Sequence, residues 1–268
     1  MGQTMNVKLM YGDELLIAYL DLCGTKFVYS KFELSQQIER IILAVSKVLD
    51  NIENTFTKDK EFLYVHMYAD SIVIAERPKS KIDKCADRLL KLMLDIQYQM
   101  LLDSELLQTQ KITDSSEQRP LYMPILSRAL IKRGKYYGLI TAFESQIDNH
   151  FFNFSLVGGS SIIEMDEILE GLPMGVYIDD STIGELTINQ DRLLDVNVNG
   201  LKFVKPLPDF DYLREIFSSS NIYYYGPENI DDWVKQLIKS TDNNIDFKSK
   251  LIPWVDAVQG RRSIICKR

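Results

Sequence analysis

Two aspartates occupy positions where a carboxylate is costly to bury and where it could act on a substrate. Asp21 closes an otherwise apolar run, residues 15–22, and Asp70 lies in the turn between two apolar segments within residues 62–75. If these strands are neighbours, the two carboxylates repel, and one is protonated at neutral pH unless a cation lies between them. Mg²⁺ or Mn²⁺ suits such a pair, because hard divalent cations bind few carboxylates and take further oxygen ligands from substrate phosphates. The pair predicts a two-metal site; the alternative is two ordinary turn residues at strand ends.

The segment that follows Asp21 is suited to holding an anion. A glycine-containing turn at a helix N-terminus presents backbone N–H groups to a negatively charged ligand. The residues in this position, leading into a predicted helix, are Leu22, Cys23, Gly24, Thr25, Lys26 and Phe27. We expect them to bind a triphosphate beside the metal ions, with Lys26 either as an additional cation or as an ordinary solvated lysine.

Hydrophobic periodicity predicts the elements that must position these residues. Strands are expected at 15–22, twice within 62–75, at 126–131 continuing over 136–143, at 175–178, and as a hairpin at 196–204. Helices are expected at 32–55, 82–106, 160–169, 231–240 and 247–258, and the polar stretch 109–119 is expected to be a loop. This order predicts an α+β fold of the ferredoxin-like split βαβ type, a mainly antiparallel sheet with helices packed on it.

The chain divides at the prolines of residues 206–208. Residues 1–205 are predicted to form the catalytic domain, and residues 206–268 a mostly helical C-terminal extension that packs on the same unit. No run of residues reads as a signal peptide or reaches the about 20 apolar residues of a membrane span. We therefore expect a cytoplasmic protein with no membrane partner.

Composition limits the kinds of partner further. The 268 residues include 31 Lys and Arg against 38 Asp and Glu, which gives a net charge of −7 and a pI near 5.0. A protein that binds the backbone of DNA or RNA needs a basic face, so no nucleic-acid partner is expected. A small anionic ligand is still compatible where a metal ion brings positive charge. Three widely spaced cysteines and two histidines argue against a structural zinc site.

Four short motifs follow one another along the chain: residues 19–25 (YLDLCGT), 68–73 (YADSIV), 128–134 (RALIKRG) and 157–170, which begins VGGS. In order and spacing they resemble the class III nucleotidyl cyclase catalytic domain. The pattern of that family is a strand ending in Asp-Ile-x-Gly-Phe-Thr, a hairpin with Gly-Asp-Ser/Ala, a strand of the form Arg-x-Gly-Ile-x-x-Gly, and a helix opened by glycine. The resemblance covers roughly residues 14–205.

The resemblance implies an activity and a set of ligands. A nucleoside triphosphate would be converted to a 3′,5′-cyclic monophosphate and pyrophosphate. Asp21 and Asp70, with the Leu22 carbonyl, would hold two divalent cations, Mg²⁺ or Mn²⁺. Sites in this family form between two protomers, so a homodimer with its sites at the interface is implied.

The residue that reads the base in this family departs from the usual types. The position four residues before Asp70 carries Lys in many adenylyl cyclases and Glu in guanylyl cyclases, and here it is His66. His66 is either a nucleotide-binding residue that contacts the base or a packed strand histidine. Phe27, Tyr64 and Tyr68 are nearby aromatic residues that could fill the pocket around a smaller base, or they are ordinary core residues.

The helix after Gly159 departs from the family pattern as well. The Asn and Arg that orient the ribose and stabilise the transition state would fall on Ile163 and Glu167, or one residue later on Glu164 and Ile168. Neither register restores the pair. The chain is therefore either a divergent enzyme or a catalytically inactive relative.

Other cations could take over the missing role. Arg128 and Lys132 on the third motif are candidate catalytic residues, and Arg133 is a candidate nucleotide-binding residue. Lys202 or Lys205 could bind a phosphate. Each of the five could equally be an ordinary solvated charge.

One divergent branch fits these features: the pyrimidine cyclases of bacterial antiphage defence (Pycsar), which are compact cytosolic domains. The resemblance to them favours UTP or CTP as substrate and a cyclic product that a separate effector reads.

The alternatives are a purine (ATP or GTP) cyclase and an inactive cyclase-like module that senses a nucleotide. A polymerase-palm or diguanylate-cyclase relative would need a Gly-Gly-Asp/Glu hairpin, which residues 68–70 lack. An interaction domain without a ligand would have no need of both aspartates.

Overall fold

The computed structural model describes residues 5–23, 25, 29–30, 33–55, 63–68, 70–77, 84–113, 126–145, 150–198, 200–205, 245–258 and 263–264. Its elements are, in chain order, β1 (Met5–Cys23), α2 (Leu34–Thr55), β2 (Leu63–Tyr68), β3 (Ser71–Glu76), α3 (Cys85–Thr113), β4 (Leu126–Ser145), β5 (His150–Gly158), α4 (Ser160–Glu170), β6 (Gly175–Asp179), α5 (Asp180–Ile183), the 3₁₀ helix η3 (Gln190–Arg192), β7 (Leu193–Val196), β8 (Leu201–Val204), α8 (Ile245–Val258) and β9 (Ser263–Ile264).

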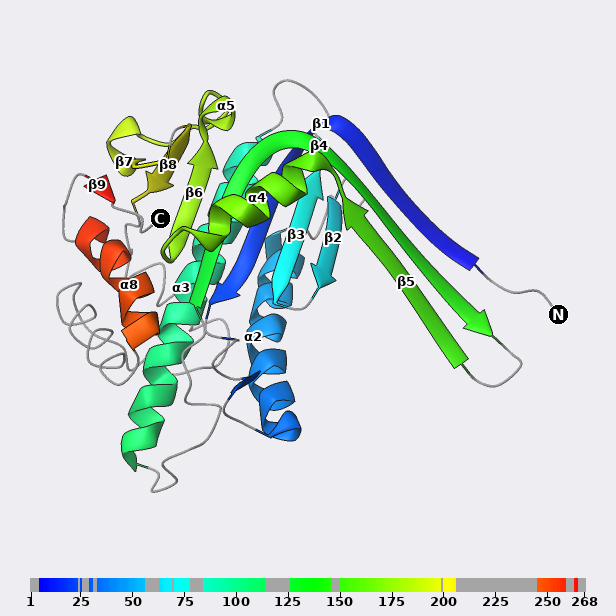
Figure 1. The fold of residues 1–268 in the computed structure, drawn as a ribbon, viewed down its shortest axis with the longest axis horizontal. Coiled ribbons are helices and arrows are strands. Elements are labelled where there is room, and N and C mark those ends of the chain that lie inside the picture. The colour runs from blue at the N-terminus through cyan, green and yellow to red at the C-terminus, as the bar shows by residue number, and fades with distance from the viewer. Residues whose placement is uncertain are drawn as a thin grey trace.

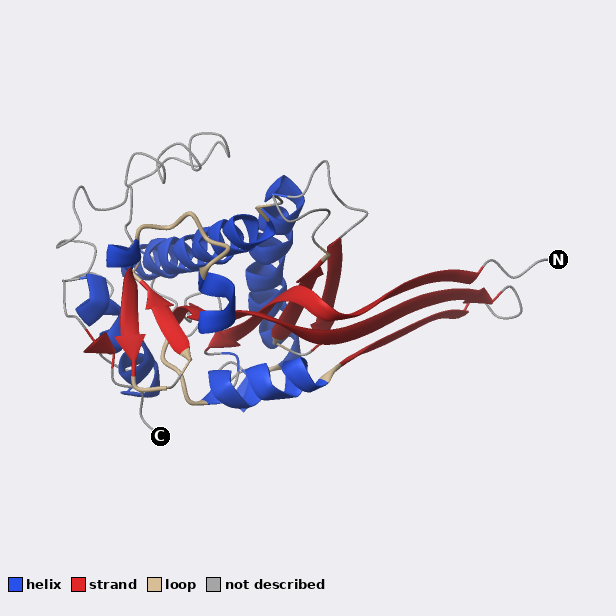
Figure 2. Ribbon diagram, turned by 90° about the horizontal axis from the view of Figure 1, so that it is seen from above, coloured by secondary structure: helices blue, strands red, loops and turns tan. Residues whose placement is uncertain are grey.

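The strands form one mixed, mostly antiparallel sheet with helices on both faces. The order within the described residues is β2-β3-β1-β4-β6-β8-β7-β9, and β5 pairs with β4. Of the strand pairs that the structure describes, β4–β6 and β7–β9 are parallel and the others antiparallel. Figures 1 and 2 show α2 and α3 together on one face of the sheet and α4 on the other. The predicted α+β class and the split βαβ order are confirmed.

The strands at the centre of the sheet are apolar because both of their faces are covered. Leu15–Leu20 of β1 and all six residues of β3 are buried. The α2 helix is amphipathic: its buried side includes Ala44, Val48 and Ile52. Among the described residues, no helix is long and apolar enough to span a membrane.

Three strands extend beyond the body of the molecule as an arm. The arm consists of the first half of β1, the second half of β4, and β5. In it, β1 pairs with β4 from Met5 opposite Phe143 onward, and β5 pairs with the other edge of β4 up to Gly158. Both views show these strands projecting away from the helices. The β1–β4 register shifts between Gly12 and Leu15, where the arm meets the body. A β-bulge of this kind bends a strand pair.

Glycine is required where α4 begins, beside this bend. Gly159 has φ +124, and a Cβ on it would lie 2.3 Å from the carbonyl oxygen of Lys135. On Gly134 a Cβ would lie 2.1 Å from the Ser161 hydroxyl oxygen, so α4 packs directly on the backbone of β4. These glycines, both within the sequence motifs, bring α4 close to the sheet.

The sequence-based boundaries were wrong in the arm. β1 begins at Met5 rather than residue 15, and β5 was not predicted. Both segments carry a strand signal that was missed. Residues 5–11 largely alternate apolar and polar side chains, and β5 (HFFNFSLVG) is rich in aromatic and apolar residues. The predicted loop at 109–119 was wrong in its first part, since α3 continues to Thr113. The rest of that stretch and the predicted helix at 231–240 lie outside the described residues.

The α8 helix packs on the same core as the sheet. Trp254 is fully buried, and its Nε1 donates a hydrogen bond of 3.1 Å to Gln97 Oε1 on α3. The backbone N–H of Met174, just before β6, donates to the Lys250 carbonyl at 3.1 Å. That all of residues 206–268 belong to the same unit as residues 1–205 stays a prediction.

We predict that Trp254→Ala lowers the free energy of unfolding by about 3–5 kcal/mol, because it removes a large buried side chain and leaves a cavity. The matched control is Ile252→Ala on the exposed side of α8, which should cost less than about 1 kcal/mol. Urea unfolding of the full chain measures both. Equal losses in the two variants would contradict the packing of α8 on the core.

Candidate active site

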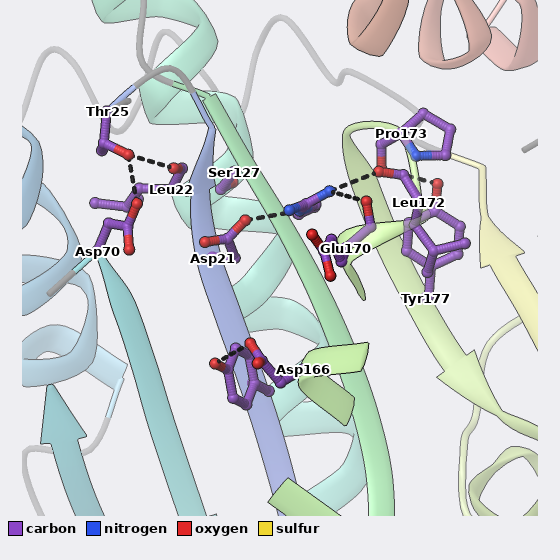
Figure 3. Close-up of polar contacts among 12 residues, drawn as sticks. Asp21, Leu22, Thr25, Asp70, Ser127, Asp166, Glu170, Leu172, Pro173 and Tyr177 are labelled. Atoms are coloured by element: carbon purple, nitrogen blue, oxygen red, sulfur yellow. Dashed lines mark hydrogen bonds and ion pairs between the residues drawn. The ribbon is translucent and has the colours of Figure 1, made fainter. Parts of the chain in front are cut away.

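The structure brings the two predicted metal-binding aspartates together. β1 pairs antiparallel with β3 so that Asp21 lies opposite Ser71, the residue after Asp70. The backbone N–H of Leu22 donates a hydrogen bond of 3.0 Å to the Asp70 carbonyl. Asp21 and Asp70 therefore lie at the same end of two neighbouring strands (Figure 3).

Thr25 connects the two strand ends. Its buried side-chain hydroxyl lies within hydrogen-bonding distance of Asp70 Oδ2 and, at 3.3 Å, of the Leu22 carbonyl oxygen. This contact orients the Asp70 carboxylate toward the segment after Asp21. Of the other residues predicted to bind nucleotide, Gly24, Lys26 and Phe27 lie outside the described residues.

Arg128 is the direct partner of Asp21. It lies opposite Asp21 in the β1–β4 register, and its Nε donates a hydrogen bond of 2.7 Å to Asp21 Oδ2. Its Nη1 donates to the carbonyl oxygens of Glu170 at 3.1 Å and Leu172 at 3.0 Å, at the C-terminal end of α4 (Figure 3). Negative charge gathers at a helix C-terminus, so one guanidinium bridges two electronegative groups.

Burial dominates the electrostatics of Asp21. It raises the pKa of the carboxyl above its ordinary value, the Arg128 guanidinium opposes the rise, and the Asp70 charge adds to it. Lys250 of α8 also acts on Asp21, in the same direction as Arg128. The ionised carboxylate of Asp21 is thus under-compensated, and a further cation beside it would stabilise the charged form.

The donor set fits a hard divalent cation. Arg128 contacts Oδ2 of Asp21 and Thr25 contacts Oδ2 of Asp70, and within the part of the chain that the structure describes the Oδ1 atom of each carboxylate accepts no hydrogen bond. The backbone carbonyl oxygen of Leu22, the residue after Asp21, would be a third oxygen ligand. The part of the chain that the structure describes holds no group of three or more His, Cys, Asp or Glu side chains placed to bind a metal. An ion held here would complete its shell from a ligand such as a phosphate.

Cys23 can contact a ligand only through its backbone. Its side chain is buried, and burial raises the pKa of the thiol to about 11. A thiol in such surroundings stays protonated and unreactive at neutral pH. The predicted nucleotide contact at Cys23, if it forms, is therefore a main-chain contact.

His66 lies on β2, the edge strand beside β3. It is buried, its ring is parallel to that of Tyr64 with centroids 6.4 Å apart, and burial lowers its pKa. A neutral imidazole offers one hydrogen-bond donor and one acceptor. The role of His66 in reading a base stays a prediction.

The structure does not bring Lys132 and Arg133 to Asp21. Lys132 lies four residues along β4 from Arg128, about 13 Å on an extended strand, and its Nζ pairs with Glu164 of α4 at 2.5 Å. Arg133 pairs with Glu185 at 2.5 Å. Their catalytic and nucleotide-binding roles stay predictions, and each would have to leave its carboxylate to meet a phosphate.

The remaining lysine candidates lie on and after β8, beyond β6 in the sheet. Lys202 pairs with Asp195 across the β7–β8 hairpin at 2.6 Å. The backbone of Lys205 exchanges hydrogen bonds with Arg192. Neither side chain contacts Asp21 or Asp70 in the described part of the chain.

Several contacts of α4 have no signal in the sequence. Tyr19, two residues before Asp21 on the same face of β1, donates a hydrogen bond of 2.7 Å to Asp166 Oδ1. Ile163, which falls where the family has Asn, is 63% exposed, and Glu167 is also exposed. The α4 helix is thus attached to β1 directly through Asp166 and Tyr19, and indirectly through Arg128 of β4, which pairs with Asp21.

No protein-family model and no curated protein matches the sequence. Solved structures match in fold. The adenylyl cyclase CyaB from P. aeruginosa gives a TM-score of 0.50 at 10% identity, over 76% of this chain and 98% of that chain. A bacterial light-regulated adenylyl cyclase gives a TM-score of 0.50 at 11% identity, over 80% of this chain and 58% of that chain. The chain therefore has an adenylyl cyclase-like fold, as the motif order predicted.

We predict that Cys23 resists alkylation in the native protein. With a thiol pKa of about 11, on the order of a thousandth is thiolate at about pH 8, and the sulfur is inaccessible. Iodoacetamide followed by peptide mass spectrometry should find Cys23 unmodified in buffer and modified in urea. Modification in buffer at the rate of an exposed cysteine would show that the end of β1 is not buried as described.

Proposed function

We propose that the chain is a metal-dependent nucleotidyl cyclase that converts a ribonucleoside triphosphate to a 3′,5′-cyclic monophosphate and pyrophosphate. The observation that carries the proposal is the pair Asp21 and Asp70 at neighbouring strand ends of a cyclase-like fold. An inactive nucleotide sensor would have no need of both carboxylates, each with an available oxygen.

In this proposal Asp21, Asp70 and the Leu22 carbonyl would hold two divalent cations, Mg²⁺ or Mn²⁺. When bound, such ions lower the pKa of a coordinated hydroxyl and stabilise negative charge on a phosphate. Thr25 keeps the Asp70 carboxylate oriented through its hydroxyl contact. Arg128 places a permanent positive charge beside Asp21, where it could act on the phosphates of a bound nucleotide.

The reaction is an intramolecular phosphoryl transfer. The proton of the ribose 3′-hydroxyl passes to solvent, and the 3′-oxygen forms a bond to the α-phosphorus. The bond between that phosphorus and the bridging oxygen to the β-phosphate breaks, and pyrophosphate leaves with the electron pair of that bond. Catalysis of this kind is mainly positioning and charge stabilisation. The cations and carboxylates at the end of β1 and β3 are the groups that would supply it.

We extend the proposal to a pyrimidine substrate, UTP or CTP. His66 stands where purine cyclases carry Lys or Glu, and its lowered pKa favours a neutral side chain with one donor and one acceptor. The resemblance to antiphage pyrimidine cyclases further implies that a separate effector reads the cyclic product.

We predict that the full chain with Mn²⁺ releases pyrophosphate and one cyclic product when each of the four ribonucleotides is supplied in turn. Mass spectrometry of the four reactions identifies the base. Asp21→Asn and Asp70→Asn should each lower turnover at least about a hundredfold, because each removes a charged metal ligand.

Asp191→Asn is the matched control, since Asp191 is exposed on η3, away from both strand ends, and it should turn over like the wild type. Full activity in both Asp21→Asn and Asp70→Asn would overturn the two-metal proposal. Tight nucleotide binding without any product would favour the sensor. A cyclic purine nucleotide as the product would overturn the proposed pyrimidine substrate.

We also propose that two copies form the active unit through the arm. Leu9 of β1 pairs with Leu139 of β4, which pairs with Leu156 of β5, and the next row joins Tyr11 to Tyr137. Register partners share one face of a sheet, so these residues form one apolar patch. Leu9 is 59%, Tyr11 65%, Tyr137 45% and Leu156 44% exposed. A patch of this kind marks an interaction surface.

We predict that Leu9→Asp combined with Tyr137→Asp converts a dimer to a monomer and lowers turnover with it, because two charges would be buried in the interface. Sedimentation velocity measures the mass. Leu34→Asp is the matched control, an exposed leucine on α2. A dimer that persists in the arm variant would contradict the use of this surface.

A further inference from the structure

Arg128 uses different nitrogens for its two sets of partners. Nε binds Asp21 Oδ2 at 2.7 Å, while Nη1 binds the carbonyl oxygens of Glu170 and Leu172. The contact with Asp21 can therefore break while the guanidinium stays attached to the end of α4. Both side chains of the ion pair are largely buried, at 12% exposed for Arg128 and 16% for Asp21.

A buried carboxylate needs a counter-charge, and in this structure Arg128 supplies it. Removing one partner of such a pair leaves an uncompensated charge in a low-dielectric site. Lys250 contributes positive potential at Asp21, and Asp70 contributes negative potential. Among the described residues Arg128 is the cation that hydrogen-bonds the carboxylate. A divalent cation that binds Asp21 would therefore bind beside this guanidinium or displace it.

Two cations at one carboxylate repel each other. The repulsion grows as the site is desolvated and with the charge of the ion, which is double for a divalent cation. A guanidinium beside Asp21 therefore opposes the binding of a divalent cation there.

We propose that Arg128 is a positioning residue that serves as a built-in counter-ion of Asp21 and competes with the divalent cation for it. The inference rests on the proposed function, because it takes Asp21 as a metal ligand. Arg128 neutralises Asp21 in the metal-free protein and lowers the affinity for metal. When a cation takes its place, Nε is released from Asp21 while Nη1 still holds the guanidinium to the end of α4. Metal binding at Asp21 therefore changes the contacts of a side chain that is attached to α4.

The test is metal binding by the full chain without nucleotide, at about pH 8, where carboxyl groups are ionised. Isothermal titration with Mn²⁺ compares the wild type with Arg128→Gln, which removes the charge, and Arg128→Lys, which keeps it. We expect Arg128→Gln to bind Mn²⁺ at least about tenfold more tightly. Arg128→Lys should stay within a few-fold of the wild type. Mn²⁺ should also raise the thermal midpoint of Arg128→Gln more than that of the wild type.

The direction of the change separates this role from a structural one. If Arg128 only held the site together, its loss would weaken Mn²⁺ binding, and weaker or unchanged binding by Arg128→Gln overturns the inference while leaving the proposed function intact. Arg192→Gln, which removes the same charge elsewhere, should bind like the wild type, and equal tightening there would also overturn it. Mn²⁺ binding that is absent from the wild type, or that survives Asp21→Asn unchanged, would overturn the proposed metal site itself.

Discussion

The arrangement of the site depends on the burial of one carboxylate. Asp21 lies near the end of β1, directly after six buried residues, Leu15–Leu20, and burial is the chief cause of its raised pKa. A charge in such a position persists only with compensating cations or hydrogen bonds. Arg128 is the compensation that the fold itself provides, and a metal ion is the compensation that the proposed function requires.

The elements around β1 supply the groups that surround the buried carboxylate of Asp21. β3 places Asp70 beside Asp21, β4 places Arg128 opposite it, and the end of α4 holds the guanidinium with two carbonyl oxygens. Tyr19 attaches α4 to the same strand through Asp166. In this way a helix that lacks the Asn and Arg of the cyclase pattern is nevertheless joined to the Asp21 carboxylate by Arg128.

The body of the fold and the two aspartates were predictable from the sequence. Contacts between residues far apart in the chain were not, because no residue pattern marks them. Strand β3 and the inner half of β1 were predictable because burial on both faces makes them continuously apolar. The outer part of β1 and strand β5 were missed, although residues 5–11 largely alternate apolar and polar side chains and β5 is rich in aromatic residues. The bond between Tyr19 and Asp166 joins residues 147 positions apart, and the main-chain carbonyls that hold Arg128 carry no sequence information. Arg128 was a candidate as a spare cation, but its pairing with Asp21 followed only from the β1–β4 register.

The most direct test of the metal site is a crystal structure of the full chain with Mn²⁺ and a triphosphate analogue that cannot cyclise, with data collected for the anomalous signal of manganese. We expect a manganese peak within about 2.3 Å of carboxylate oxygens of both Asp21 and Asp70. The triphosphate oxygens should complete the shell, and Arg128 Nε should no longer contact Asp21. Manganese bound elsewhere, or a nucleotide bound away from these strand ends while Arg128 still pairs with Asp21, would contradict it.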